Sequence, residues 1–242
     1  MIAGVSPDLP HTDELPPTKE WGLRLLRHPV RLVLSTWWRV RVHGRQHLPR
    51  RGPAILVANH LGFLDGPAVV AFTPRQTFTV AKTELFHGAL GRLLTYVGQI
   101  PVHRHQPDTW AIDRAVQVLR AGKVLLLFPE GRRTGGEVAH AHRGAAYLAM
   151  VTGAPLVPVA LLGTREPGHT DAQLPRRGGP VHIVYGAPFT LPREPWPRRR
   201  AEVGRWTEHI RQHLAEHVVA AQALTGLPLP GPPRAKSHLT RR

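Results

Sequence analysis

Residues 54–67 read Ala-Ile-Leu-Val-Ala-Asn-His-Leu-Gly-Phe-Leu-Asp-Gly-Pro, and the expected fold is built outward from this stretch. The five apolar residues Ala54–Ala58 predict a buried strand, because uninterrupted apolar runs of this length are typical of parallel sheets. Gly62 permits a bend after that strand, and Pro67 fits the first turn of a helix. The stretch therefore predicts a strand, a turn and a helix in succession.

His60 and Asp65 flank this bend, five positions apart. That spacing puts two side chains on different faces of a straight helix or strand, so they can meet only if the chain turns between them. A carboxylate on one imidazole nitrogen fixes the tautomer and raises the basicity of the other nitrogen. The pair alone leaves two interpretations open. It is either a general base with its orienting acid, or a helix N-cap beside an ordinary strand-end histidine.

Apolar runs and helical stretches alternate through most of the chain. This alternation predicts an α/β fold with a sheet covered on both faces. The strands that we expect are 39–43, 54–59, 76–81, 99–102, 124–128, 156–161 and 181–185. The helices that we expect are 66–72, 89–97, 108–121, 143–152 and 197–224. Because parallel strands end at a common edge, the His60–Asp65 turn would lie where open α/β sheets place their sites.

The composition excludes the commonest forms of covalent catalysis. The chain has 242 residues, which suits one large domain, and 42% of them are hydrophobic, enough for a substantial core. It contains no cysteine, which excludes a disulfide scaffold, a thiolate zinc site and a cysteine nucleophile. Its serines are Ser6, Ser35 and Ser237, and none lies in the Gly-x-Ser-x-Gly setting of a serine hydrolase.

The chain is strongly basic, with 32 Lys and Arg against 16 Asp and Glu and a net charge of +16. Such a charge indicates nucleic acid, an anionic membrane surface or a polyanionic substrate as a partner. GC-biased codon usage is an alternative source, since the cations are 28 Arg and only 4 Lys. Residues 19–51 hold nine of these cations and one acid, Glu20, so this segment is a candidate for contact with an anionic surface.

Four segments are expected along the chain. Residues 1–18 would be a disordered lead, 39–224 the folded domain and 225–242 a disordered tail rich in Pro and Arg. Residues 19–38 would form two short amphipathic helices, separated at Pro29, that associate with a membrane. A core-packing helix with an Arg-rich solvated face is the alternative for this segment. No run reaches the roughly 18 apolar residues of a membrane span, and the start does not read as a signal peptide.

Four motifs follow one another in the order and at the spacing of one enzyme family. They are Asn59-His60 with Asp65, a series from Lys82 to Arg104, Phe128–Thr134 and Val157–Ala160. On these motifs, over roughly residues 39–190, the chain resembles bacterial 1-acylglycerol-3-phosphate acyltransferases of the phospholipid/glycerol acyltransferase superfamily. The resemblance implies a mixed, largely parallel sheet covered by helices on both faces, as in glycerol-3-phosphate acyltransferase, and makes 39–224 an acyltransferase domain.

The resemblance also implies a reaction. An acyl group would pass from acyl-CoA or acyl-carrier protein to the free hydroxyl of lysophosphatidic acid and give phosphatidic acid, with no metal or cofactor. His60 would be the general base for that hydroxyl, and Asp65 would orient it. The residues that would bind the acceptor are Arg104, Glu130, Gly131 and Arg133. Of these, the two arginines would hold its phosphate.

The third motif departs from the family pattern, because Arg132 replaces the usual Thr and Thr134 the usual Ser. The extra cation would suit a phosphate or a more anionic headgroup. The alternatives are acyl transfer to another lysolipid, a basic nucleic-acid-binding module, and a membrane-binding scaffold without activity. We expect no nucleic-acid partner, since the chain has no recognised binding motif and only 6% aromatic residues. The expected location is peripheral, on the cytoplasmic side of the cell membrane.

Overall fold

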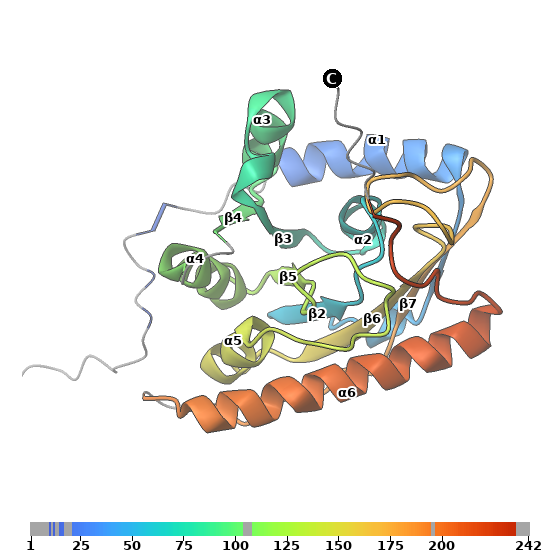
Figure 1. Cartoon of the computed structure of the whole chain (residues 1–242). Helices are drawn as coiled ribbons and strands as arrows, with labels where there is room; N and C mark the ends of the chain where they lie inside the picture. The colour runs from blue at the N-terminus through green and yellow to red at the C-terminus, as the bar shows by residue number, and fades with distance from the viewer. Residues whose placement is uncertain are drawn as a thin grey trace, which may run out of the picture.

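Seven strands form one sheet across the middle of the molecule (Figure 1). The computed structural model describes residues 10, 12, 15, 16, 21–103, 108–194 and 197–235. The strands are β1 (Arg39–His43), β2 (Ala54–Ala58), β3 (Thr77–Lys82), β4 (Ile100–Val102), β5 (Val124–Leu127), β6 (Leu156–Leu162) and β7 (Pro180–Tyr185). Each of the seven predicted strands is present, and each end lies within one residue of its predicted position.

The sheet is mixed and largely parallel, as the resemblance implied. Its order is β1-β7-β6-β2-β5-β3-β4, and the five strands from β6 to β4 run in the same direction. β7 is antiparallel to β6, and β1 is parallel to β7, so these two strands run the other way. β2 lies between β5 and β6, and all five of its residues are buried. Burial on both faces explains its continuous apolar sequence.

Helices cover both faces of the sheet (Figure 1). The helices are α1 (Trp21–Trp37), α2 (Asp65–Phe72), α3 (Gly88–Tyr96), α4 (Thr109–Arg120), α5 (Gly144–Thr152) and α6 (Arg200–Thr225), with short 3-10 turns η1 (Arg45–His47) and η2 (Thr83–Leu85). Leu56 of β2 packs in one buried cluster with residues of α1 and α2. Ile55 and Val57 point to the opposite face and pack with α4 and α5, while α6 lies along β6. The alternation follows from the pleat of the strand.

α1 is one continuous helix with Pro29 inside it, which corrects the prediction of two separate pieces. Proline removes one main-chain donor, so the carbonyl four residues earlier, at Leu25, has no N–H from position 29. Both Leu25 and Pro29 are exposed, which leaves water to satisfy that carbonyl. None of the helices in the described ranges is both long and apolar enough to cross a bilayer.

The C-terminal segment is ordered as far as it is described, contrary to the prediction of a disordered tail from residue 225. After α6 ends at Gly226 (φ +70°), residues 227–235 run back over the molecule without regular secondary structure. Leu229 is partly buried against the third apolar cluster, and the main chain of Gly231 accepts a hydrogen bond from Arg165. Several prolines do not prevent docking where apolar and main-chain groups find partners. Residues 236–242 lie outside the described residues.

Most of the predicted N-terminal lead, 1–18, also lies outside the described residues. Its described positions contact α4. The carbonyl of Leu15 accepts a hydrogen bond from Gln117 (3.0 Å), and the carbonyl of Pro10 accepts one from Arg120 (2.8 Å).

Candidate active site

The end of β2 and the start of α2 bring His60 and Asp65 together. His60 Nδ1 lies 2.7 Å from Asp65 Oδ2. Asp65 is completely buried, whereas the His60 side chain keeps 13% of its exposure. An ionised carboxylate only accepts hydrogen bonds, so Nδ1 carries the proton and Nε2 keeps its lone pair. Among the described residues, Nε2 has no hydrogen-bond partner, so it is the nitrogen that a substrate can reach.

Asp65 is held by the turn itself. Its Oδ2 also accepts from the main-chain N–H groups of Leu61 (2.6 Å) and Gly62 (2.8 Å). It is the first residue of α2, with Leu64 at the N-cap position, and its side chain reaches back into the turn rather than forward to the helix. The interpretation of Asp65 as an ordinary N-cap is therefore wrong. The N-terminus of α2 favours a negative charge at this position.

Further contacts position His60 through its ring, its main chain and the preceding residue. Its ring stacks on Phe128, with centroids 4.1 Å apart and planes 19° apart. Its main-chain N–H donates to Glu130 Oε1 (2.9 Å), and its carbonyl accepts from the N–H of Thr134 (2.8 Å). Asn59, the residue before it, uses its amide to bond both main-chain groups of Leu161 on β6 (2.7 and 3.0 Å). The base is thus fixed between β2, β6 and the loop after β5.

Glu130 is 6% exposed, and both its carboxylate oxygens are bonded to protein donors. Besides His60 N–H, it accepts from the hydroxyl of Thr134. Burial raises the pKa of Glu130, and these two hydrogen bonds act in the opposite direction. Glu130, which was predicted to bind the acceptor, thus lies against the main chain of His60. Gly131, the next residue, has φ +67°, and a Cβ there would lie 2.5 Å from the ring of His142, so this position requires glycine.

Arg133 lies beside the turn that carries His60. Its guanidinium is 5.7 Å from the ring centroid of Phe63, within that turn. Its Nη1 donates to the carbonyl of Asp171 (3.1 Å) and lies 3.5 Å from Asp171 Oδ2. The side chain is 22% exposed, so the cation remains accessible. Arg104, the other predicted phosphate-binding residue, lies outside the described residues.

Sequence reasoning missed Arg165, which is 2% exposed and follows β6. Its Nε donates to the carbonyl of Leu61 (2.8 Å), and its Nη2 to that of Thr134 (2.9 Å). Burial lowers the pKa of Arg165, and the negative charge of Asp65 acts in the opposite direction. Its partners are main-chain carbonyls, which no residue pattern reveals, so the sequence contained no signal for this role.

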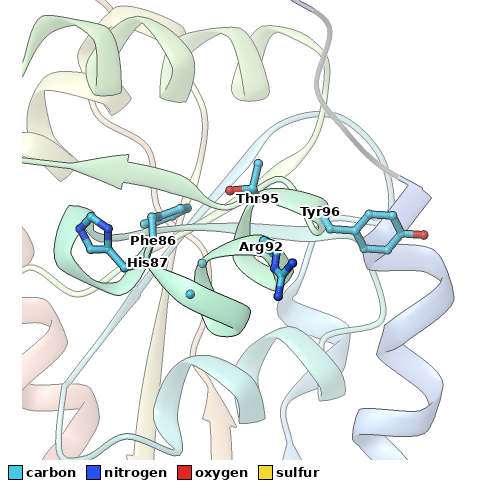
Figure 2. Close-up of a pocket in the computed structure, with 7 residues that line it drawn as sticks. Phe86, His87, Arg92, Thr95 and Tyr96 are labelled. Carbon is cyan, nitrogen blue, oxygen red and sulfur yellow. The ribbon is translucent and has the colours of Figure 1, made fainter.

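A hollow in the described surface lies away from these residues. A cavity of about 560 Å³ is lined by residues of α3 and the turn before it, including Phe86, Arg92 and Tyr96 (Figure 2). Of the predicted site residues that the structure describes, none lines it. Tyr96 extends toward α1, where a Cβ on Gly22 would lie 2.4 Å from the Tyr96 carbonyl oxygen. No cluster of three or more metal-ligating side chains occurs within the described ranges.

A buried carboxylate holds an accessible imidazole at the carboxyl edge of a largely parallel sheet, and the chain offers no cysteine to act as a nucleophile. Such an arrangement is typical of α/β enzymes in which a histidine acts as a general base. The protein-family model described as "Acyltransferase" matches residues 39–162, about half of the chain. The matched range includes both His60 and Glu130. The protein belongs to the acyltransferase family and is an O-acyltransferase.

Relatives of known name agree with this assignment. The chain is 32% identical over 189 residues to the 1-acyl-sn-glycerol-3-phosphate acyltransferase of Bacillus subtilis, covering 77% of this chain and 92% of that protein. It is 33% identical over 159 residues to a lyso-ornithine lipid O-acyltransferase of Pseudomonas aeruginosa, covering 61% and 60% of the two chains. It spans about half the length of the plant relatives, with 27% identity to Arabidopsis thaliana LPAT1 over 65% of this chain and 46% of that one.

A solved structure shares the fold. The 1-acyl-sn-glycerophosphate (LPA) acyltransferase PlsC from Thermotoga maritima superposes with a TM-score of 0.56 at 22% identity, over 82% of this chain and 80% of that one. The α/β fold class that the sequence predicted is confirmed by this match and by the observed sheet.

Proposed function

We propose that the protein transfers an acyl group from acyl-CoA or acyl-carrier protein to the free hydroxyl of lysophosphatidic acid, giving phosphatidic acid. Membership of the acyltransferase family and the name of the Bacillus subtilis relative support this acceptor. The observation that carries the proposal is the hydrogen bond between His60 Nδ1 and the buried carboxylate of Asp65, 2.7 Å long. It leaves Nε2 as a base at the accessible side of the ring.

The reaction follows from this geometry. His60 Nε2 takes the proton of the acceptor hydroxyl as its oxygen attacks the thioester carbonyl carbon. The tetrahedral intermediate expels the thiolate, which receives the same proton from the imidazolium. The charge of Asp65 stabilises that imidazolium during the step. One histidine thus serves as base and then as acid, and no acyl-enzyme forms, in agreement with the absence of cysteine from the chain.

Arg133 supports a phosphate-bearing acceptor. Its guanidinium is anchored on one side by Asp171 and lies over Phe63 in the turn of residues 60–65, here called the catalytic turn, which also carries His60. A guanidinium fork suits a phosphate monoester. Arg104 is proposed as the second phosphate ligand on the resemblance alone.

A second acceptor class is favoured by the relative from Pseudomonas aeruginosa, which is named for a lyso-ornithine lipid. Assays of the protein with lysophosphatidic acid and with a lyso-aminolipid distinguish the two acceptors. If Arg133→Ala lowers turnover of the phosphate monoester selectively, the phosphate role holds. An equal loss on both acceptors, or no loss on either, contradicts that role.

We also propose that the enzyme works at the cytoplasmic surface of an anionic membrane. α1 carries exposed apolar side chains, with Trp21 79%, Leu25 61% and Leu32 66% exposed. Leu93 and Tyr96 of α3 are also about half exposed, at 45% and 47%. Gly22 of α1 lies against Tyr96 at the end of α3, and the two helices are neighbours in Figure 1, so these side chains belong to neighbouring parts of the molecule. Such a surface, flanked by arginines, suits an interfacial helix.

The decisive test of the reaction is His60→Ala, assayed with labelled acyl-CoA and lysophosphatidic acid. Loss of a general base lowers kcat by about 10²–10⁴-fold. His209→Ala is the matched control, because His209 is an exposed histidine on α6, on the opposite face of the sheet. Thioester-dependent acylation by His60→Ala near the wild-type rate would show that the mechanism is wrong.

A further inference from the structure

Arg165 is a buried cation that the reaction just described does not use. It lies in the loop between β6 and β7, beyond residues 39–162 that the family model matches, and is 2% exposed. Within the described chain it forms no ion pair with a carboxylate. A buried charge is costly unless hydrogen bonds replace its hydration. The contacts that compensate this charge therefore indicate what the residue does.

Four main-chain carbonyls surround the guanidinium. Nε donates to Leu61 (2.8 Å), Nη2 to Thr134 (2.9 Å) and Gly231 (2.6 Å), and Nη1 to His169 (3.3 Å). These carbonyls belong to four segments that are far apart in sequence: the catalytic turn, the loop after β5, the loop between β6 and β7, and the C-terminal segment. One side chain thus ties four irregular segments to each other.

Two of the residues whose carbonyls bind Arg165 also contact the catalytic pair through their own N–H groups. The N–H of Leu61 donates to Asp65 Oδ2 (2.6 Å), while its carbonyl is held by Arg165. The N–H of Thr134 donates to the carbonyl of His60 (2.8 Å), while its own carbonyl is held by Arg165. The guanidinium fork therefore fixes main-chain groups on both sides of the His60–Asp65 pair.

The C-terminal segment 227–235 packs against the loop after β5 and the loop that carries Arg165. A Cβ on Gly136, in the loop after β5, would lie 2.4 Å from a methyl group of Leu61 and 2.9 Å from one of Leu229. Leu229 and Leu61 thus both pack against Gly136. The N–H of Arg234 donates to the carbonyl of His169 (3.0 Å), which ties the segment to the loop that carries Arg165.

We propose that Arg165 is a positioning residue that, together with the C-terminal segment 227–235, holds the catalytic turn and the loop after β5 in the geometry in which His60 can act. The expected fall in kcat rests on the proposed function. The expected loosening of the segments that Arg165 holds rests on the structure alone. Arg165 does not touch the substrate in this role, so its loss lowers kcat and leaves substrate binding nearly unchanged.

The kinetic test compares Arg165→Met with wild type in the full-length chain. Methionine keeps part of the apolar stem and removes all four hydrogen bonds. A small displacement of reacting groups costs about 10²-fold in rate, so we expect kcat to fall about a hundredfold while KM for the thioester and the acceptor changes less than about threefold. Arg176→Met is the control, because Arg176 lies in the same loop but its side chain is 77% exposed. A wild-type kcat in Arg165→Met, or a raised KM at unchanged kcat, overturns the proposal.

Hydrogen–deuterium exchange gives a readout that needs no activity. In Arg165→Met, peptides covering 59–66, 129–137 and 227–235 should exchange faster, while peptides of α4 and α6 should keep wild-type protection. If exchange accelerates equally everywhere, Arg165 serves the general stability of the fold and the proposal fails. If wild type itself has no acyltransferase activity, the proposed function fails, and the exchange pattern still decides the positioning role.

Leu229→Ala is a second variant that leaves Arg165 in place and removes only the apolar contact of the C-terminal segment. We expect a smaller loss of kcat than in Arg165→Met, with faster exchange confined to 227–235 and the catalytic turn. Unchanged kcat and exchange in this variant would contradict the part of the proposal that concerns the segment.

Discussion

At the scale of single residues, three hydrogen bonds converge on one oxygen of Asp65. One of its oxygens accepts hydrogen bonds from the His60 ring and from two main-chain N–H groups, in a fully buried position. An amide oxygen at that place keeps the acceptor but not the charge. In the proposed reaction, this charge stabilises the imidazolium that forms when His60 takes a proton.

We therefore expect Asp65→Asn to lower kcat by about 10²–10⁴-fold. Weakening hydrogen bonds to a charged group should also lower the free energy of unfolding by about 1.5–3 kcal/mol. Steady-state kinetics and urea unfolding measure the two effects. Asp113→Asn, on α4 at the opposite face of the sheet, is the control and should keep activity. Equal kcat in wild type and Asp65→Asn would remove Asp65 from the mechanism.

The bend at Gly62 permits the pairing of His60 with Asp65, but the residues alone left an ordinary N-cap open, and the resemblance to the acyltransferases decided between the two. The sequence did not predict that Glu130 would be buried beneath His60, since a carboxylate in a loop usually faces solvent. Arg165 was beyond prediction because its partners are main-chain carbonyls, which every residue type carries. Residue-type patterns reveal side-chain chemistry and hide contacts of this kind.

At the scale of elements, α1 joins the core on one side and presents apolar groups on the other. Leu23 and Leu34 of α1 are buried, as is Trp38 directly after the helix, whereas Leu25 and Leu32 lie on the exposed side. The alternative of a core-packing helix thus describes the buried side, while membrane association of the exposed side stays a prediction. Deleting residues 1–38 would damage the core, so point variants are the sharper test of membrane binding.

We expect Leu25→Asp combined with Leu32→Asp to reduce sedimentation with anionic vesicles at least about tenfold, because each substitution removes apolar contact and adds repulsion. Val219→Asp combined with Leu224→Asp is the matched control. Those two residues are 64% and 63% exposed on α6 and should not contact the membrane. If both double variants lose binding equally, the effect comes from net charge and not from α1.

The elements themselves were well predicted from periodicity, because strands buried on both faces and amphipathic helices have distinct patterns. The errors came from proline. Pro29 did not interrupt α1, because the carbonyl it leaves without a partner faces solvent, and the Pro-rich C-terminal segment docks through Leu229 and Gly231. Proline content indicates where regular structure ends, and it does not indicate whether the chain beyond is ordered.

At the scale of the whole molecule, the net charge of +16 and the 16 histidines make acid a general destabilising condition. Two histidines at the β1–β7–α6 side of the sheet concentrate this effect. His182 on β7 is 4% exposed, and its ring stacks on that of His43 on β1, with an angle of 8° between the ring planes. His217 on α6 lies 2.9 Å from the carbonyl of Val184, which requires a proton on its Nε2.

Burial lowers the pKa of His182 below 6.5, and the nearby cations His43 and Arg41 lower it further. Burial also lowers the pKa of His217, and the hydrogen bond to Val184 opposes this shift. The unfolded chain therefore binds more protons than the folded chain between the folded pKa values and about 6.5. In that window the free energy of unfolding rises with pH, and it is progressively lost as the pH falls through it.

We expect the urea-derived free energy of unfolding to be lower at about pH 5.5 than at about pH 7.5, by at most about 1.4 kcal/mol for each of the two histidines, because pH 5.5 lies about one unit below their unfolded pKa. His182→Gln should reduce this pH dependence, because glutamine cannot become charged, whereas His28→Gln should not, since His28 is exposed on α1. Arg41 and His43 disfavour a charge on His182, and His213 and His47 disfavour one on His217, so exchange should accelerate first in β1, β7 and α6 on acidification. If His182→Gln keeps the pH dependence of wild type, His182 does not cause the acid sensitivity, and the general positive charge of the surface explains it instead.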